Sequence, residues 1–109
     1  APNQKIYQNV YKNFKKLVTY SLIKHAMIGL TKYYASDLAK FGITCNAISP
    51  SGVYNKQNKK FITNLVSLIP MKRMAKEEDI SGVIAFLASD LSTYMTGQDI
   101  RVDGGFGLK

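Results

Sequence analysis

Cysteine, histidine and arginine are scarce in this 109-residue sequence, and it contains no long apolar run. The one cysteine, Cys45, cannot form a disulfide within the chain, and its apolar neighbours predict a small buried side chain. One cysteine and one histidine are too few for a Cys/His metal site, so no metal is expected. No stretch approaches the roughly 18 apolar residues of a membrane-spanning helix, so no membrane partner is expected. Sparse cysteine usage favours a reducing, cytoplasmic location.

The charge is strongly of one sign, with a formal net charge of +8 and an isoelectric point near 9.7. Only Arg73 and Arg101 are arginines, and the lysines are scattered among Asn, Gln, Ile and Tyr instead of forming a basic stripe. This pattern does not favour a nucleic-acid partner. The alternative of a basic nucleic-acid-binding module predicts duplex binding that weakens steeply with salt.

The length and the residue patterns predict one partial domain over residues 1–109, with alternating helices and strands. Residues 1–16 are polar, lack a clear period and are expected to be a loop. The elements expected after them are a helix over 16–41 ended by Gly42, a strand over 43–49 closed by Pro50, a connection over 50–74 with a weak helix over 60–69, an amphipathic helix from Glu77 to about Ser89, and a strand over 99–102 between turns at 96–98 and 103–105.

This order predicts an α/β fold in which the two strands are adjacent and parallel, with flanking helices. Two strands are too few to bury both faces of a parallel sheet, so the unit resembles the end of something larger. The apolar residues of the first helix cover more than one of its faces. A helix of that kind needs a partner on more than one side, and one partner is expected to be a second subunit.

Tyr20 and Lys24 lie one helical turn apart, which places a phenol and an ammonium on the same face. An ammonium in that position stabilises the phenolate, so the tyrosine can exchange a proton with a substrate hydroxyl or carbonyl. The spacing alone is weak evidence, because seven tyrosines and 13 lysines give about one such pair by chance. Tyr11 and Lys15 form a second pair of the same kind.

The sequence around Tyr20 distinguishes the two pairs, because residues 19–106 resemble the short-chain dehydrogenase/reductase family almost throughout. The blocks that carry the resemblance stand in the family's order and at its usual separations. They are Y-S-L-I-K-H-A-M-I-G-L-T-K, D-L-A-K-F-G-I-T-C-N-A-I-S-P-S-G-V, P-M-K-R-M, E-E-D-I-S-G-V-I-A-F-L-A-S-D and Y-M-T-G-Q-D-I-R-V-D-G-G-F. The resemblance implies the C-terminal part of a Rossmann-like, doubly wound parallel sheet, from which the glycine-rich N-terminal half is absent.

The resemblance also implies the roles of particular residues. Tyr20 is expected to be the general acid/base during hydride transfer, and Lys24 to assist it and bind the nicotinamide ribose. The segment Pro50, Ser51, Gly52 and Val53 is expected to approach the nicotinamide, with the Val53 backbone at its carboxamide. Asn46, Arg73 and Asp103 also match family positions, and structural roles are expected for them. Asn46 and Asp103 are expected to satisfy backbone groups near the two strands, and Arg73 to anchor the end of the connection over 50–74. His25 points about 100° away from Lys24 and is expected to be a packing or surface residue.

The chain departs from the family pattern in several places. Ser51 stands where glycine is usual, and Asn55 stands where a threonine often assists. The family's catalytic serine has no counterpart, since no serine precedes Ser21; an insertion over residues 1–19 would place it upstream. No glycine-rich strand–turn–helix is present to hold a cofactor pyrophosphate.

These features predict an NAD(P)-dependent oxidoreductase, with NAD or NADP as cofactor and a small-molecule carbonyl or secondary alcohol as substrate. Sugar-derived and acyl-carrier-linked carbonyls both remain open, and the insertion-like stretch tilts the expectation toward a sugar pathway. The complete enzyme is expected to be a homodimer or homotetramer, and these residues alone are expected to be inactive. The alternative is a non-catalytic fragment that acts only in folding or oligomerisation.

Overall fold

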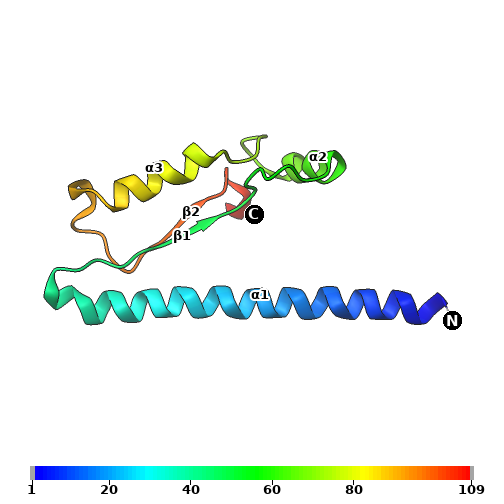
Figure 1. Cartoon of the computed structure of the whole chain (residues 1–109), viewed down its shortest axis with the longest axis horizontal. Coiled ribbons are helices and arrows are strands. Elements are labelled where there is room, and N and C mark those ends of the chain that lie inside the picture. Colours follow the sequence, from blue (N-terminus) through cyan, green and yellow to red (C-terminus); the bar gives the residue numbers. More distant parts are fainter. Residues whose placement is uncertain (1, 109) are drawn as a thin grey trace.

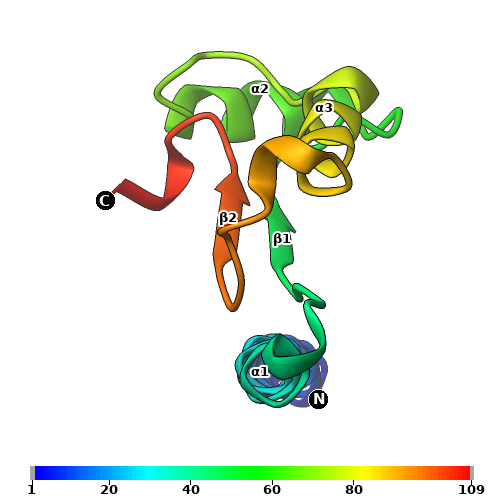
Figure 2. The same ribbon diagram turned by 90° about the vertical axis from the view of Figure 1, so that its left-hand side faces the viewer.

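The computed structural model describes the backbone of residues 2–108 and the side chains of residues 18–108. Two short parallel strands, β1 (Ala47–Pro50) and β2 (Asp99–Val102), form a sheet. The long helix α1 (Pro2–Leu38) lies on one side of the strands, and α3 (Glu77–Leu87) lies on the other (Figures 1 and 2). The helix α2 (Lys59–Leu68) lies beyond the carboxyl ends of the strands. The predicted α/β architecture with adjacent parallel strands is confirmed.

Helix α1 begins at Pro2, so the loop expected over residues 1–16 is wrong where the structure describes it. Gly29 is the only glycine or proline between Pro2 and Gly42, and Lys, Gln and Asn are compatible with a helix even without an apolar period. A proline at the first helical position already has the φ angle that a helix needs. The helix ends as predicted: a 3₁₀ turn over Ala39–Phe41 leads into Gly42, whose φ is 74°.

Strand β1 begins four residues later than expected, because side chains replace the strand ladder before Ala47. The Cys45 N–H donates to the Thr96 hydroxyl (3.1 Å), and the Asn46 amide bonds the Met95 C=O and the Gln98 N–H (3.1 Å each). The Gly97 N–H also donates to the Cys45 C=O (2.7 Å), but the regular ladder starts only where the Ala47 N–H donates to the Gln98 C=O (2.8 Å). From there Ala47 pairs with Asp99 in register, and the pairing ends at Pro50 and Val102. Strand β2 has the predicted bounds.

The two shorter helices agree with the sequence-based prediction to within about two residues. Helix α2 is capped by Asn58, whose side chain accepts from the Lys60 N–H (2.8 Å). Helix α3 carries Glu77, Glu78 and Asp79 in its first turn, where the helix dipole favours negative charge. Among the described residues, none of the helices combines the length and hydropathy of a membrane-spanning segment.

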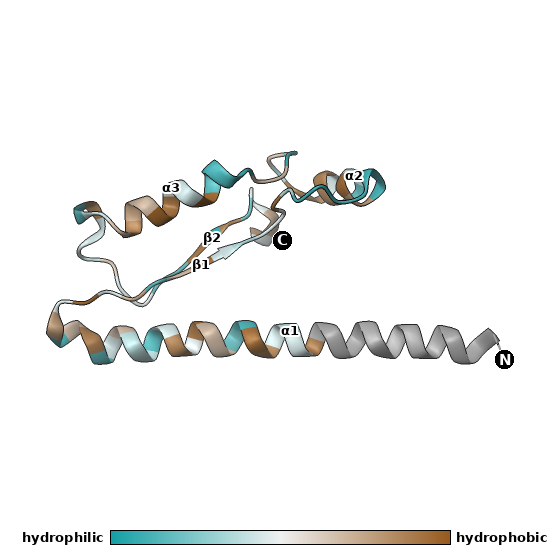
Figure 3. Cartoon of the chain, viewed as in Figure 1, coloured by the Kyte–Doolittle hydropathy of each residue, from teal (hydrophilic) through white to brown (hydrophobic). Residues whose placement is uncertain are grey.

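The buried core of the described residues is small. Its apolar members are Ala35 on α1, and Ile69 and Met74 between α2 and α3. Many large apolar side chains are exposed instead, and hydrophobic residues recur along the described part of α1 (Figure 3).

Candidate functional site

The structure brings Tyr20 and Lys24 together with the end of β1. Their side chains line a hollow of about 180 Å³ between α1 and β1, which also includes Pro50; we call it the Tyr–Lys hollow. The rest of its lining is mainly apolar: Ile23, Met27, Ile28, Ala47, Ile48 and Ser49. The Tyr20 side chain is 63% exposed, so a molecule in the hollow can reach it from solvent. The hollow lies beside the carboxyl end of a parallel strand, where open α/β sheets bind ligands.

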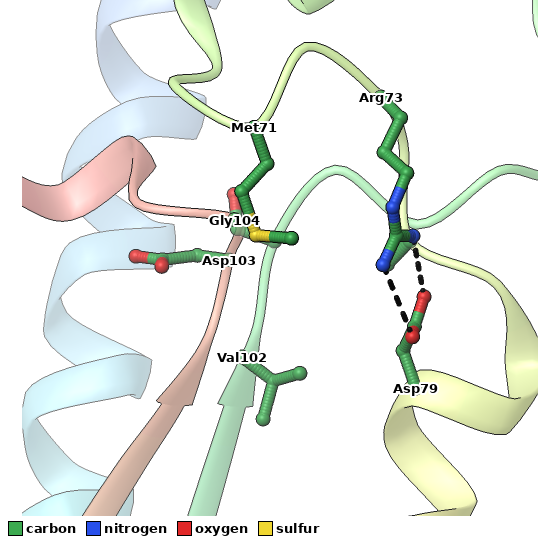
Figure 4. Close-up of a pocket in the computed structure, with 8 residues that line it drawn as sticks. Met71, Arg73, Asp79, Val102, Asp103 and Gly104 are labelled. Carbon is green, nitrogen blue, oxygen red and sulfur yellow. Dashed lines mark hydrogen bonds and ion pairs between the residues drawn. The ribbon is translucent and has the colours of Figure 1, made fainter.

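The remaining residues of the predicted cofactor segment face other parts of the molecule. Ser51 lines a second hollow of about 210 Å³ on the side of the sheet that carries Arg73 and Asp79 (Figure 4). Val53 lines a wider cleft between α2 and the start of α3. Of the four residues from Pro50 to Val53, only Pro50 shares the hollow of Tyr20 and Lys24. The other three residues lie outside the lining of this hollow.

The backbone around Val53 is held from one side only. The Ala75 N–H donates to the Gly52 C=O (2.8 Å), and the Tyr54 N–H donates to the Ala75 C=O (3.0 Å). In an extended chain, the N–H and C=O of Val53 therefore point to the opposite side. The Val53 C=O accepts from the Gln57 amide (3.0 Å), whereas its N–H has no partner among residues 18–108. A free backbone donor thus lies just past the end of β1.

Gln57 holds the turn that follows Val53, a role that the sequence reasoning missed. Its side-chain oxygen accepts from the Asn55 N–H (2.8 Å), while its amide nitrogen donates to the Val53 C=O. The polar run over 54–60 indicates only a loop, and its composition does not mark which amide bonds the backbone. The turn also places Lys56 at a positive φ of 55°.

Arg73 fixes the connection between α2 and α3, as expected, and its partner is Asp79. The guanidinium donates to both carboxylate oxygens (2.8 and 3.4 Å) and to the Met74 C=O (3.2 Å). Figure 4 shows the two bonds to the carboxylate. The bonds from Arg73 and from the Lys76 N–H lower the pKa of Asp79 to about 2. Asp79 therefore acts as a structural anion that ties the connection to the first turn of α3.

Asn46 and Asp103 satisfy backbone groups near the strands, which confirms their predicted structural roles. The Asp103 carboxylate accepts from the N–H groups of Gly105 and Gly107 (2.9 Å each). These bonds lower the pKa of Asp103 below its usual value. His25 is exposed, and its Nδ1 lies 2.7 Å from the Ser21 C=O, in agreement with a surface residue.

Two further sequence-based expectations have a different outcome. Cys45 is half-buried in the described structure, so the expected burial is only partial. The competing pair Tyr11–Lys15 lies on α1, but its side chains fall outside the described ones.

The structure also contains a hydroxyl–carboxylate bond that the sequence did not predict. Ser49, in the Tyr–Lys hollow, donates to Asp99 on β2 (2.5 Å). The two residues are 50 positions apart, and only the parallel register brings them together.

Comparison with known proteins gives matches over most of the chain. The sequence profile of the family described as enoyl-(acyl carrier protein) reductase matches residues 7–107. The chain is 42% identical over 90 residues to the 3-oxoacyl-[acyl-carrier-protein] reductase of Staphylococcus epidermidis, covering 79% of this chain and 37% of that protein. It is 37% identical over 90 residues to the human (3R)-3-hydroxyacyl-CoA dehydrogenase, covering 79% of this chain and 34% of that protein.

Among solved structures, the fold is similar to a short chain dehydrogenase from Leptospira borgpetersenii with bound NAD⁺. The TM-score is 0.77 at 42% identity, and the match covers 80% of this chain and 34% of that one. The chain thus spans about a third of the length of the relatives it matches.

Proposed function

Because the chain belongs to the short-chain dehydrogenase/reductase family, we propose that the full-length protein carrying it is an NAD(P)-dependent oxidoreductase. Its reaction is hydride transfer between the nicotinamide and a substrate carbonyl or secondary alcohol. The observation that carries the proposal is the Tyr–Lys hollow, where a phenol and an ammonium one helical turn apart meet the end of a parallel strand. Of the two Tyr-x-x-x-Lys pairs in the sequence, this one stands in the block Y-S-L-I-K-H-A-M-I-G-L-T-K that carries the family resemblance.

Tyr20 is the proposed general acid/base. Its hydroxyl gives a proton to the substrate oxygen during carbonyl reduction and removes it during alcohol oxidation. Lys24 stabilises the phenolate form, because an opposite charge on the same helix face favours the ionised group.

The residues at the carboxyl end of β1 suit the nicotinamide end of the cofactor. NAD(P) supplies the hydride or accepts it. Lys24 and Tyr20 provide donors for ribose hydroxyls. The Val53 N–H, which has no partner among residues 18–108, is the proposed donor for a carboxamide oxygen. Pro50, Ser51 and Gly52 complete the backbone of this segment. The sequence has no glycine-rich loop, so these residues hold the nicotinamide end and not the pyrophosphate.

For the substrate we propose an acyl thioester with a 3-oxo group. The expectation of a sugar pathway rested on reading residues 1–19 as an insertion, whereas the Staphylococcus reductase and the human dehydrogenase are both named for acyl substrates. We further propose that the protein acts in the cytoplasm as a homodimer or homotetramer. The exposed apolar residues of α1 support an additional partner on that face.

The decisive test is the Tyr20→Phe variant of the full-length protein. Oxidation of NADPH or NADH by a 3-oxoacyl thioester is followed by absorbance, and cofactor affinity by fluorescence titration. We expect kcat to fall by about a thousandfold, because proton transfer by a positioned side chain contributes on the order of 10²–10⁴-fold. Cofactor affinity is expected to fall only about two- to tenfold, since the variant loses one hydrogen bond to the ribose, worth about 0.5–1.5 kcal/mol, while Lys24 still binds it.

The matched control is Tyr11→Phe, which changes the second Tyr-x-x-x-Lys pair of the sequence. Full activity in this control, together with loss in Tyr20→Phe, assigns the chemistry to the pair in the hollow. Retention of more than a small percentage of activity in Tyr20→Phe removes Tyr20 from the acid/base role. An inactive wild-type protein with every carbonyl substrate tested favours the non-catalytic alternative.

A further inference from the structure

Ile69 is the most deeply buried large side chain of the described residues, at 2% exposure. It lies directly against two glycine backbones that follow the strands. A Cβ added at Gly52 would lie 3.1 Å from Ile69 Cδ1, and one added at Gly104 would lie 2.8 Å from Ile69 Cγ2. Both glycines have positive φ angles, 68° and 62°. Only glycine permits this close approach of one side chain to both strand ends.

The segment Ile69–Ala75, which we call the strap, is also bonded to both strand ends. The Met71 N–H donates to the Gly104 C=O after β2 (3.0 Å); Figure 4 labels both residues. The Ala75 N–H donates to the Gly52 C=O after β1 (2.8 Å), and the Ala75 C=O accepts from the Tyr54 N–H (3.0 Å). Ile69 therefore packs against Gly52, the same residue to which Ala75 is hydrogen-bonded.

This arrangement fixes the direction of the free Val53 N–H. The Gly52 C=O, which accepts from the Ala75 N–H, and the Val53 N–H belong to one planar peptide, so a shift of Gly52 reorients the Val53 N–H. We infer that Ile69 is a positioning residue for the reaction, because its Cδ1 sets the place of Gly52 and through it the direction of the Val53 N–H. This inference rests on the proposed function, in which that N–H faces the nicotinamide carboxamide. Ile69 itself does not line the Tyr–Lys hollow.

The test is the variant Ile69→Val in the full-length protein, which removes Cδ1 and retains Cγ2. The matched control is Ile80→Val, which removes the same methyl group from a half-buried residue of α3 outside the strap. In the cofactor-free protein, hydrogen exchange of the Tyr54 and Ala75 amides is expected to accelerate about tenfold in Ile69→Val alone, because local opening governs exchange. Melting temperatures of the two variants are expected to agree within a few degrees.

With cofactor and substrate, kcat of Ile69→Val is expected to fall about tenfold, while the Kd of the cofactor changes less than about twofold. The reason is that a small displacement of a reacting ring costs rate more than affinity. A second variant, Ile69→Leu, keeps the side-chain volume and moves its branch point. It therefore distinguishes an effect of where the methyl groups lie from an effect of lost packing volume. It is expected to show the same loss of kcat with an unchanged melting temperature.

The outcomes separate this inference from the proposed function. Wild-type kcat and wild-type amide exchange in both Ile69 variants overturn the inference alone. A fall in kcat that Ile80→Val reproduces overturns it as well, since any lost core methyl would then suffice. A wild-type protein without oxidoreductase activity overturns the proposed function, and the positioning role falls with it.

Discussion

At the scale of single residues, Asp79 carries more interactions than any other acidic side chain of the described region. It receives two bonds from Arg73 and one from the Lys76 N–H, and it lies in the first turn of α3. Its charge therefore stabilises both the connection that precedes the helix and the helix start. The pKa of this carboxyl is lowered from 3.8 to about 2, with the bond from Arg73 as the largest cause.

We predict that this pair makes stability pH-dependent in acid. Because the folded-state pKa of Asp79 is below its unfolded value, its contribution is complete above pH 3.8 and is lost as the pH falls through about 2. Asp79→Asn should lower the melting temperature of the full-length protein at neutral pH, and the difference from wild type should shrink as the pH approaches 2. Thermal melts at several pH values measure this.

The control for this prediction is Glu78→Gln, which removes a charge from the same helical turn without a bond to Arg73 in the structure. A difference between Asp79→Asn and wild type that stays constant from neutral pH to 2 would contradict the prediction. Salt provides a second check, because Arg73 and Asp79 are partly exposed and their attraction is screened.

Single residues also show how far the sequence could be interpreted. Tyr20, Lys24, Asn46, Arg73 and Asp103 were identified because they stand in family blocks, and the structure gives the last three the expected structural bonds. Other contacts have no local signal in the sequence. Ile69 resembles any apolar residue at a helix end, and its contacts with Gly52 and Gly104 span 17 and 35 positions. Only the folded path of the chain reveals them.

At the scale of elements, Gly42 ends the long helix in a left-handed conformation. Its φ is 74°, and a Cβ built there meets no atom within 4 Å, so the only obstacle to a side chain is backbone strain. We predict that Gly42→Ala destabilises the full-length protein by about 1 kcal/mol, because L-residues other than Gly, Asn and Asp rarely adopt this conformation. Chemical denaturation measures the free energy of unfolding.

Gly42→Asn is the informative comparison, since asparagine tolerates the left-handed region, and it should cost clearly less than Gly42→Ala. Equal losses in the two variants would argue that Gly42 matters for packing instead of conformation. Such a result would also imply a partner segment close to the end of the helix.

Element boundaries were predictable where a backbone requirement marks them. Gly42 marks the end of α1, and the acidic first turn marks the start of α3; both boundaries were predicted from these residues. The start of β1 was not predictable, because Thr96 and Asn46 supply side-chain bonds that delay the ladder by four residues. The start of α1 was not predicted, because residues 1–16 lack an apolar period and were therefore expected to be a loop. Their polar residues are nevertheless compatible with a helix.

At the scale of the whole molecule, α1 is apolar on faces that the sheet does not cover. Leu22, Leu30 and Tyr33 are 67, 53 and 65% exposed, and their spacing of eight and three residues places them near one side of the helix. Burial of such side chains is worth roughly 1.5–3 kcal/mol each. A second copy of the protein on this side would remove that surface from water in both copies at once.

We therefore predict that a charge on this side disrupts the assembly. Tyr33→Glu should convert the full-length protein from a dimer or tetramer to a smaller species, because an unpaired carboxylate in an apolar interface costs several kcal/mol. Lys32→Glu changes the neighbouring residue, which lies about 100° around the helix, and should leave the assembly intact. Light scattering after size exclusion gives the mass of each variant. A monomeric wild-type protein, or equal masses for Tyr33→Glu and wild type, would show that something other than a second copy covers α1.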